Sequence, residues 1–205
     1  MLITFEGTDY SGKSTQARML LAWLEERKRA VLFLREPGGT LISEKIREIL
    51  LDRKHLELTE LTEILLFSAA RTQLVSEVIR PALRDGTIVL CDRFFDSTTA
   101  YQGYGRGLAL ADVKLLNKIA TAGLVPDLTI LVDVTAEEAA RRREAAGEPV
   151  DRMESAGREF FSRVRAGYHA IIKEEPARWV VLDGMRPVDA IQADIRVAVE
   201  SRLSH

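Results

Sequence analysis

The most informative stretch of the chain is Gly7-Thr8-Asp9-Tyr10-Ser11-Gly12-Lys13-Ser14, which fits the pattern G-x-x-x-x-G-K-[ST]. Its glycines allow backbone N–H groups to point inward around phosphate oxygens. A helix that begins near Lys13 would turn its N-terminus toward the same anion. We expect Lys13 to reach the β- and γ-phosphates of a nucleotide and the Ser14 hydroxyl to bind Mg²⁺. The pattern therefore predicts a nucleotide-phosphate site over residues 7–15, with Thr15 included.

Short apolar runs alternate with segments of helical periodicity along the chain. The first run directly precedes the phosphate loop, which is the context that this pattern requires. The apolar runs predict strands at Leu2–Phe5, Ala30–Leu34, Thr87–Cys91, Leu128–Val134 and Trp179–Leu182. The periodic segments predict helices at Lys13–Lys28, Ser43–Leu51, Thr59–Leu83, Ser97–Tyr104, Leu110–Ala122, from Ala136 onward, Ser155–Glu174 and Pro187–Leu203. Strands separated by helices indicate an α/β fold with a parallel sheet covered on both faces, and such sheets bind ligands at the carboxyl ends of their strands.

The composition excludes several classes of protein. The 29 Lys and Arg residues against 31 Asp and Glu give a net charge of −2, which argues against a non-specific nucleic-acid binder. The single cysteine, Cys91, forms no internal disulfide. No apolar run approaches the roughly 20 residues of a membrane span, and Met1–Glu6 lacks the basic region of a signal peptide. These features predict one domain over residues 1–205, a cytoplasmic location and no membrane or nucleic-acid partner.

The pair Asp92-Arg93, after the third predicted strand, bears on the kind of phosphate chemistry. A carboxylate at this strand end holds Mg²⁺ in other phosphate-loop proteins, and the alternative role of Asp92 is a helix cap. Arg93 beside a metal site indicates a second anion, because arginine forks bind phosphate bidentately. A GTPase is disfavoured, since the one Asn-Lys pair continues as Asn117-Lys118-Ile119-Ala120 and lacks the acid that reads guanine.

Eight segments carry a more specific signal than the phosphate loop alone. They are Phe5-Glu6-Gly7, the phosphate loop, Arg35-Glu36-Pro37-Gly38-Gly39, Phe67-Ser68-Ala69-Ala70-Arg71, Asp92-Arg93-Phe94, Asp96-Ser97, Tyr101-Gln102-Gly103 and Asp151-Arg152-Met153-Glu154. In these segments, and in their order, the chain resembles the thymidylate kinase family. The resemblance implies a three-layer P-loop NTPase fold with a five-stranded parallel sheet, helices on both faces and a short lid. It also implies a homodimer that transfers the γ-phosphoryl group of MgATP to dTMP, giving dTDP and ADP.

The same resemblance implies an acceptor site. Arg93 and Arg47 would hold the acceptor phosphate, Phe67 would stack on thymine and Arg71 would donate to a base carbonyl. Tyr101 would crowd the sugar where a ribonucleotide carries its 2′-hydroxyl, which selects deoxynucleotides by steric clash. The further residues implied are Asp9 near the 3′-hydroxyl, Glu36 and Pro37 near the metal and acceptor, and Ser97, Thr98 and Gln102 near the base edge. By periodicity alone, Phe67 would instead belong to the core.

A lid is predicted at about residues 141–154. Arginines end one helix there, and the glycine-containing stretch Ala145–Val150 interrupts the helical pattern. Closure of a lid excludes water and brings guanidinium charge onto a transferring phosphoryl group. The resemblance implies that the arginine at the transferring phosphoryl group comes either from the phosphate loop or from the lid. The phosphate loop here contains no arginine, so the resemblance implies that Arg143 and Arg152 supply the catalytic charge, and it places Arg142 near adenine. The alternative is a solvated basic helix end, which would complement the helix dipole.

Two other functions remain open at this point. One is a nucleoside or nucleotide kinase with a different acceptor, which would need different base readers at Arg71 and Gln102. The other is a phosphate-loop switch or assembly module that binds a nucleotide without phosphorylating a metabolite. Arg93 after Asp92, together with a lid, argues against such a module.

Overall fold

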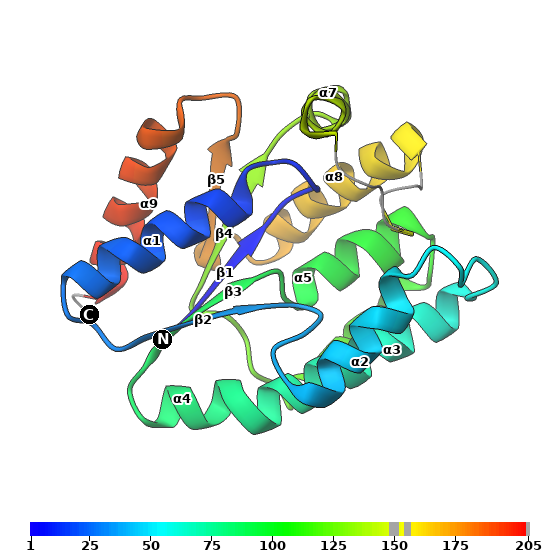
Figure 1. Ribbon diagram of the computed structural model, residues 1–205, viewed down its shortest axis with the longest axis horizontal. Helices are drawn as coiled ribbons and strands as arrows, with labels where there is room; N and C mark the ends of the chain where they lie inside the picture. Colours follow the sequence, from blue (N-terminus) through cyan, green and yellow to red (C-terminus); the bar gives the residue numbers. More distant parts are fainter. Residues whose placement is uncertain (148–151, 154–156, 204–205) are drawn as a thin grey trace.

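The computed structural model describes residues 1–147, 152–153 and 157–203. Five parallel strands form one sheet in the order β2-β3-β1-β4-β5 (Figure 1), which confirms the predicted fold class. The strands are β1 Leu2–Glu6, β2 Val31–Arg35, β3 Ile88–Asp92, β4 Leu128–Asp133 and β5 Trp179–Asp183. The α-helices are α1 Lys13–Glu26, α2 Leu41–Leu51, α3 Glu60–Leu74, α4 Arg80–Arg84, α5 Phe95–Thr98, α6 Leu110–Ala120, α7 Ala136–Ala146, α8 Gly157–Glu174 and α9 Val188–Leu203. The other helical segments are the π-helices η1 Val75–Ile79 and η2 Thr99–Gly105 and the 3₁₀-helix η4 Pro176–Arg178.

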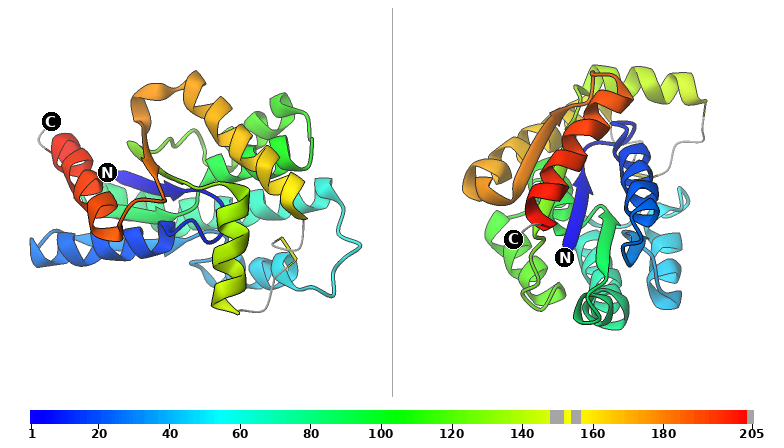
Figure 2. Two further views of the ribbon diagram at one scale, coloured as in Figure 1. Left: turned by 90° about the horizontal axis from the view of Figure 1, so that it is seen from above. Right: turned by 90° about the vertical axis from the view of Figure 1, so that its left-hand side faces the viewer.

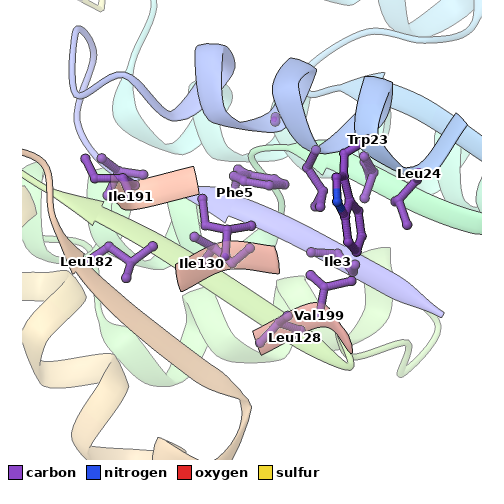
Figure 3. Packing of buried hydrophobic residues seen from close by; sticks show 14 of the residues in the cluster. Ile3, Phe5, Trp23, Leu24, Leu128, Ile130, Leu182, Ile191 and Val199 are labelled. Carbon is purple, nitrogen blue, oxygen red and sulfur yellow. The ribbon is translucent and has the colours of Figure 1, made fainter. Parts of the chain in front are cut away.

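Helices cover both faces of the sheet (Figures 1 and 2). Successive residues of a strand point to opposite faces, so β1 contributes to two cores. Ile3 and Phe5 pack against α1 and α9, where Trp23 and Val199 join the same cluster (Figure 3). On the other face, Leu2 packs with residues of α3 and η1. Within the described residues, no helix is long and apolar enough to cross a membrane.

The sheet register brings the predicted site residues to one edge. In the parallel pairing of β1 with β3, Phe5 lies opposite Asp92, and the N–H of Arg93 donates to the Phe5 carbonyl oxygen at 2.9 Å. The phosphate loop and Asp92-Arg93 therefore leave neighbouring strands side by side at the carboxyl edge. This is the edge at which parallel α/β sheets bind their ligands.

Two predicted helices are not single α-helices. The segment predicted as Thr59–Leu83 consists of α3, η1 and α4 in succession, with a π-helical stretch between two α-helices. The segment predicted as Ser97–Tyr104 begins as α5 and continues as η2. Apolar periodicity does not distinguish these forms, because one wide turn shifts the buried face by only one residue. The η2 segment carries Tyr101 and Gln102, so this departure lies within the predicted acceptor site.

Candidate active site

The phosphate loop connects β1 to α1 and is shaped by its glycines. Gly7 has a φ of 138°, and a Cβ atom there would lie 2.6 Å from the Val132 carbonyl oxygen, so no larger residue fits. Gly12, at a φ of 97°, immediately precedes α1. Lys13 is buried, and its Nζ donates to the Thr8 carbonyl oxygen at 3.3 Å. Burial and the Arg93 charge lower the pKa of Lys13, while nearby carboxylates oppose this shift. The loop thus holds a buried ammonium group against the Thr8 carbonyl oxygen.

Asp92 lies directly beside the start of α1. Its Oδ2 accepts a hydrogen bond from the Ser14 hydroxyl, and its buried Oδ1 has no partner among the described residues. An unpaired buried carboxylate oxygen next to a hydroxyl fits a hard divalent cation. No cluster of three or more His, Cys, Asp or Glu residues with metal-binding geometry occurs in the described part of the chain. Two oxygen ligands suit Mg²⁺, which takes its other ligands from phosphates and water.

Asp9 is the centre of a charged cluster that the phosphate loop makes with β3 and η2. Its Oδ1 accepts from Arg93 at 2.5 Å and lies 3.6 Å from Lys13, and its Oδ2 accepts from the Tyr101 hydroxyl at 3.1 Å. Burial alone would raise the pKa of Asp9. The charges of Arg93 and Lys13 and the hydrogen bonds from Arg93 and Tyr101 outweigh burial and hold that pKa well below its usual range. Asp9 therefore remains a carboxylate at any pH near neutrality.

Arg93 is held in place from several sides. Its φ is 70°, a left-handed conformation that is uncommon for a residue with a side chain. The guanidinium donates to the Gly7 carbonyl at 2.9 Å, to Ser97 at 3.0 Å and to Tyr101 at 3.0 Å. A non-glycine residue in this conformation is maintained only when surrounding contacts over-determine it. Arg93 is thus a fixed cation at the junction of β3 with the phosphate loop.

Glu6 accepts hydrogen bonds from residues next to this cluster, and this role was not predicted. The carboxylate is fully buried and accepts from the Phe94 N–H at 2.8 Å, the Ser97 hydroxyl at 2.5 Å and the Tyr168 hydroxyl at 2.9 Å. Burial, followed by the nearby Asp96 carboxylate, raises the pKa of Glu6 to about 7. The sequence offered one signal, an acid that ends an otherwise apolar buried strand. Such a residue needs partners, because an unpaired buried charge is very costly.

A cavity opens on the β2–β3 side of this cluster, and the predicted acceptor residues line it. It is lined by Asp9, Glu36, Pro37, Arg47, Leu51, Phe67, Arg71, Arg93, Phe94, Ser97, Thr98, Tyr101, Gln102 and Met153. Every residue predicted to bind the acceptor is in this set. The helical stretch that carries Phe67 places that side chain both at the cavity wall and against the core cluster around Tyr168. Core packing and exposure to the cavity are thus compatible for this residue.

Arg71 has buried partners on three sides. It donates from Nε to Glu36 at 2.7 Å, and its other nitrogens reach Asn117 at 3.3 Å, Thr98 at 3.0 Å and the Phe94 carbonyl at 3.3 Å. Burial raises the pKa of Glu36 and the Arg71 charge lowers it, with burial the larger effect. The second oxygen of Glu36 is buried without a partner among the described residues. Asn117, which belongs to no guanine-reading motif, is instead a supporting residue of this network.

Arg47 comes to the cavity from α2. It donates to the Pro37 carbonyl at 2.9 Å, and that carbonyl also accepts from Arg35 at 2.9 Å. The Glu36–Pro37 peptide bond is cis. The turn after β2 therefore fixes an arginine of the short helix at the cavity mouth, within the same set of lining residues as Arg93.

Glu63 is a second buried acid that was not predicted. It is 1% exposed, and its Oε1 accepts from Gln102 Nε2 at 2.8 Å. Arg106 lies at 3.2 Å from both carboxylate oxygens, and Arg152 lies at 2.7 Å from Oε2. Periodicity gives no indication of this residue, because a single acid within a helical pattern is most often a solvated one. Its three partners come from distant parts of the chain.

A second cavity lies on the α7–α8 side of the phosphate loop. Its lining includes Asp9, Tyr10, Arg143, Arg158 and Phe161. Asp9 thus forms part of the wall of both cavities. Arg143 reaches this second cavity from the last turn of α7.

Arg142 lies beside the phosphate loop. Its NH1 donates to the Ser11 carbonyl at 3.1 Å, and its NH2 donates to the Gly184 carbonyl at 2.8 Å. It therefore bridges the phosphate loop to the turn after β5.

The predicted lid arginines are separated in the structure. Arg143 faces the cavity beside the phosphate loop, whereas Arg152 is buried against α2 and α3, where its Nε donates to the Leu50 carbonyl at 2.8 Å. Residues 148–151 and 154 of the predicted lid lie outside the described residues, and they include Asp151 and Glu154. Of the two arginines expected to be catalytic, only Arg143 lies beside the phosphate loop in this conformation.

Comparisons with known proteins agree with this geometry. A family model described as thymidylate kinase matches residues 5–195. A thymidylate kinase of Chlorobaculum parvum is 50% identical, over 98% of this chain and 96% of the relative. One of Caldanaerobacter subterraneus subsp. tengcongensis is 48% identical, over 98% and 95%. A crystal structure of thymidylate kinase from Ehrlichia chaffeensis superposes with a TM-score of 0.80 at 35% identity, over 98% of both chains. The chain, with a phosphate loop between two cavities and relatives that match it from end to end, belongs to the thymidylate kinase family.

Proposed function

We propose that the chain transfers the γ-phosphoryl group of MgATP to dTMP, giving dTDP and ADP. The observation that carries this proposal is the position of Asp9, which lines both cavities and is hydrogen-bonded to Arg93. One cavity adjoins the nucleotide-phosphate loop, and the other contains the residues expected to bind an acceptor. A kinase needs a donor site and an acceptor site that adjoin, so that the γ-phosphoryl group and the acceptor phosphate are held next to each other.

In this proposal the acceptor phosphate is held by Arg93 and Arg47, and the base lies between Phe67 and the polar wall made by Arg71 and Gln102. The acceptor nucleophile is already an anion, so the reaction needs no strong general base. Positioning and neutralisation of charge supply the rate enhancement. Lys13 would contribute on the donor side, where it lies within the phosphate loop.

We propose that Ser14 and Asp92 hold the Mg²⁺ that accompanies ATP. The support is the unpaired, buried Oδ1 of Asp92 beside a hydroxyl at the start of α1. The ion would supply positive charge to the β- and γ-phosphates. The protein's own part is to fix two oxygens at a strand end next to the phosphate loop.

Arg143 is the better candidate for the arginine that stabilises charge on the transferring group. Its support is its position in the cavity that also contains Asp9 and Tyr10. Arg152 would have to leave Glu63 and the Leu50 carbonyl before it reached that cavity. In the proposed lid, Arg143 therefore acts from a helix end that lines the cavity beside the phosphate loop, and Arg142 contributes to the adenine side.

We also propose that the enzyme is a cytoplasmic homodimer. Large apolar side chains are exposed on α3 and on the two helices that pack against it, α2 and α6. They are Ile42 and Ile49 of α2, Leu61 and Leu65 of α3, and Leu115 and Ile119 of α6. Clustered apolar residues on a surface mark an interface. Sedimentation of the wild type and of a Leu65→Glu/Ile119→Glu variant tests this, because the variant should sediment as a monomer and the wild type as a dimer.

The reaction is tested by ADP release from MgATP in a coupled assay with dTMP, dUMP, UMP, CMP, AMP, GMP and thymidine. Strong stimulation by dTMP above the others is the expected result. Stimulation by a different acceptor would retain the kinase and overturn the assignment of the base readers. Nucleotide binding without stimulation by any acceptor would favour a switch or assembly module.

A further inference from the structure

The buried carboxylate of Glu63 lies behind the wall of the acceptor cavity, and the cavity lining itself does not include it. It projects from the first turn of α3 and meets Gln102 of η2 across the helix interface. Gln102 is 2% exposed and lines the cavity. Glu63 thus reaches the acceptor site through one intermediate side chain.

Two arginines fix the charge of Glu63. Arg106 and Arg152 lie within 3.2 Å of its oxygens, so two guanidinium groups face this buried carboxyl group. A buried carboxylate is retained only when it is paired in this way. Glu63 is therefore an ionised group, and an ionised carboxylate only accepts hydrogen bonds.

This charge determines which way the Gln102 amide points. The two ends of an amide side chain differ, since the NH₂ group donates and the carbonyl oxygen accepts. Because Glu63 can only accept, the NH₂ end must face it, as the 2.8 Å contact with Nε2 has it. No hydrogen bond among the described residues reaches the carbonyl oxygen of Gln102, a cavity-lining residue. The amide therefore presents an acceptor to whatever occupies the cavity.

Arg71, the other polar residue expected to bind the base, differs from Gln102 in its hydrogen-bonding groups. Arg71 carries donors only, and its guanidinium is fixed by Glu36, Asn117 and Thr98. Arg71 and Gln102 both line this cavity. Together, a donor and an acceptor match the edge of thymine or uracil, which offers the O4 carbonyl next to the N3–H group. Cytosine offers an amino donor next to an unprotonated nitrogen, so both positions would be mismatched.

We propose that Glu63 is a positioning residue that determines base specificity. It holds the Gln102 amide in the one orientation that accepts the N3–H of thymine or uracil and rejects cytosine. This inference rests on the proposed phosphorylation of dTMP. It assigns the choice between the two kinds of pyrimidine to a residue that touches neither the substrate nor the phosphates.

The test is the ratio of kcat/KM for dTMP to kcat/KM for dCMP in the wild type and in a Glu63→Gln variant. In the variant, residue 63 can donate as well as accept, so the Gln102 amide can turn over and offer its NH₂ group to the cavity. We expect the ratio to fall about tenfold or more, because a site built to hydrogen-bond one partner discriminates strongly. The change should appear mainly in KM, and the ratio of dTMP to dUMP should stay constant, because both bases carry N3–H.

A double variant, Glu63→Gln/Gln102→Glu, separates positioning from damage to the fold. A carboxylate at position 102 accepts at both ends, so one oxygen takes the NH₂ group of the new glutamine and the other faces the cavity. The preference for dTMP over dCMP should return toward the wild-type ratio. A ratio measured in one preparation does not depend on the fraction of active enzyme, so partial unfolding does not obscure the result.

Asp96→Asn provides the matched control. Asp96 is also a buried carboxylate paired with an arginine, Arg178, at 2.7 Å to each oxygen, but it does not line the acceptor cavity. Its loss should lower the melting temperature and leave the dTMP to dCMP ratio unchanged. An unchanged ratio in Glu63→Gln, or an equal fall in Asp96→Asn, would overturn the inference alone. A wild-type enzyme that does not phosphorylate dTMP would overturn the proposed function and this inference with it.

Discussion

The phosphate loop and the acceptor cavity meet at Asp9, yet they are built in different ways. The loop is made by eight consecutive residues, and its shape comes from backbone conformation at Gly7 and Gly12. The cavity is made by side chains from α2, α3, α5 and η2 and from the turns after β2 and β3, and buried ion pairs such as Arg71–Glu36 fix them. A local structure depends on its own sequence, whereas an assembled one depends on the whole fold. The two halves should therefore respond differently to substitution.

The largest effect is expected on the loop side. Lys13→Ala removes the one ammonium group of the loop and should lower kcat by at least about a thousandfold, because charge stabilisation in a water-excluded site is a large term. The fold should survive, since Lys13 makes one backbone hydrogen bond at 3.3 Å and one ion pair, with Asp9 at 3.6 Å. Steady-state kinetics with a melting curve on the same sample checks both expectations. Near-normal turnover would contradict the assignment of the loop.

The two arginines of the predicted lid, Arg143 and Arg152, should differ in their effects on kcat and on stability. Arg143→Ala should lower kcat by about a thousandfold, at the lower end of the effect of losing an arginine finger. Arg152→Ala should change kcat much less and lower the melting temperature more, because Arg152 pairs with buried Glu63 and bonds the Leu50 carbonyl. Single-turnover kinetics and thermal denaturation of both variants separate the roles. A larger loss of kcat in Arg152→Ala would assign the catalytic charge to Arg152 instead.

Glu6, which lies beneath the phosphate-loop side of the site, should make the free energy of unfolding depend on pH. Its pKa of about 7 in the folded chain lies above the ordinary 4.5, so between these values the folded chain binds more protons than the unfolded one. The contribution of Glu6 to stability is therefore lost as the pH rises from about 4.5 through 7, by on the order of 3 kcal/mol. Glu6→Gln should remove this dependence. Denaturant unfolding of both proteins at pH 5 and pH 8 measures it, and parallel pH curves would contradict the shift.

The smallest effect is expected at the hydroxyl of Tyr101. Tyr101→Phe deletes the hydrogen bonds to Asp9 and Arg93 and keeps the ring, so the KM for dTMP should rise about fivefold, as for the loss of about 1 kcal/mol. The preference for deoxyribonucleotides should remain, because the proposed selection depends on the bulk of the ring. Assays with dUMP and UMP as alternative acceptors test this. Equal use of both by the variant would show that the hydroxyl makes the selection.

The sequence predicted the sheet and the loop side best. The five strands were found because each is a short apolar run, and the loop was found because its glycines and Lys13 stand in one segment. The supporting roles of Glu63 and Asn117 were missed for the converse reason. Glu63 meets Gln102 across 39 positions and Arg71 meets Asn117 across 46, and nothing local records these pairs.

The helical segments show the same limit. The apolar pattern predicted helix over Thr59–Leu83 and Ser97–Tyr104, and the chain is helical over most of both. It did not distinguish α-helix from the π-helical stretches, because that difference lies in which backbone groups pair. Tyr101 and Gln102, adjacent in η2, both line the cavity.

The shared position of Asp9 has a thermodynamic consequence. A ligand that takes over the hydrogen bonds from Arg93 or Tyr101 on one side changes the charge that a ligand on the other side meets. Free energy is a state function, so the factor by which a bound donor analogue changes the dissociation constant of dTMP must equal the factor by which dTMP changes that of the analogue. Calorimetry of all four binding steps of this cycle would measure one coupling free energy between the two substrates, which we expect to depend on the Asp9 carboxylate.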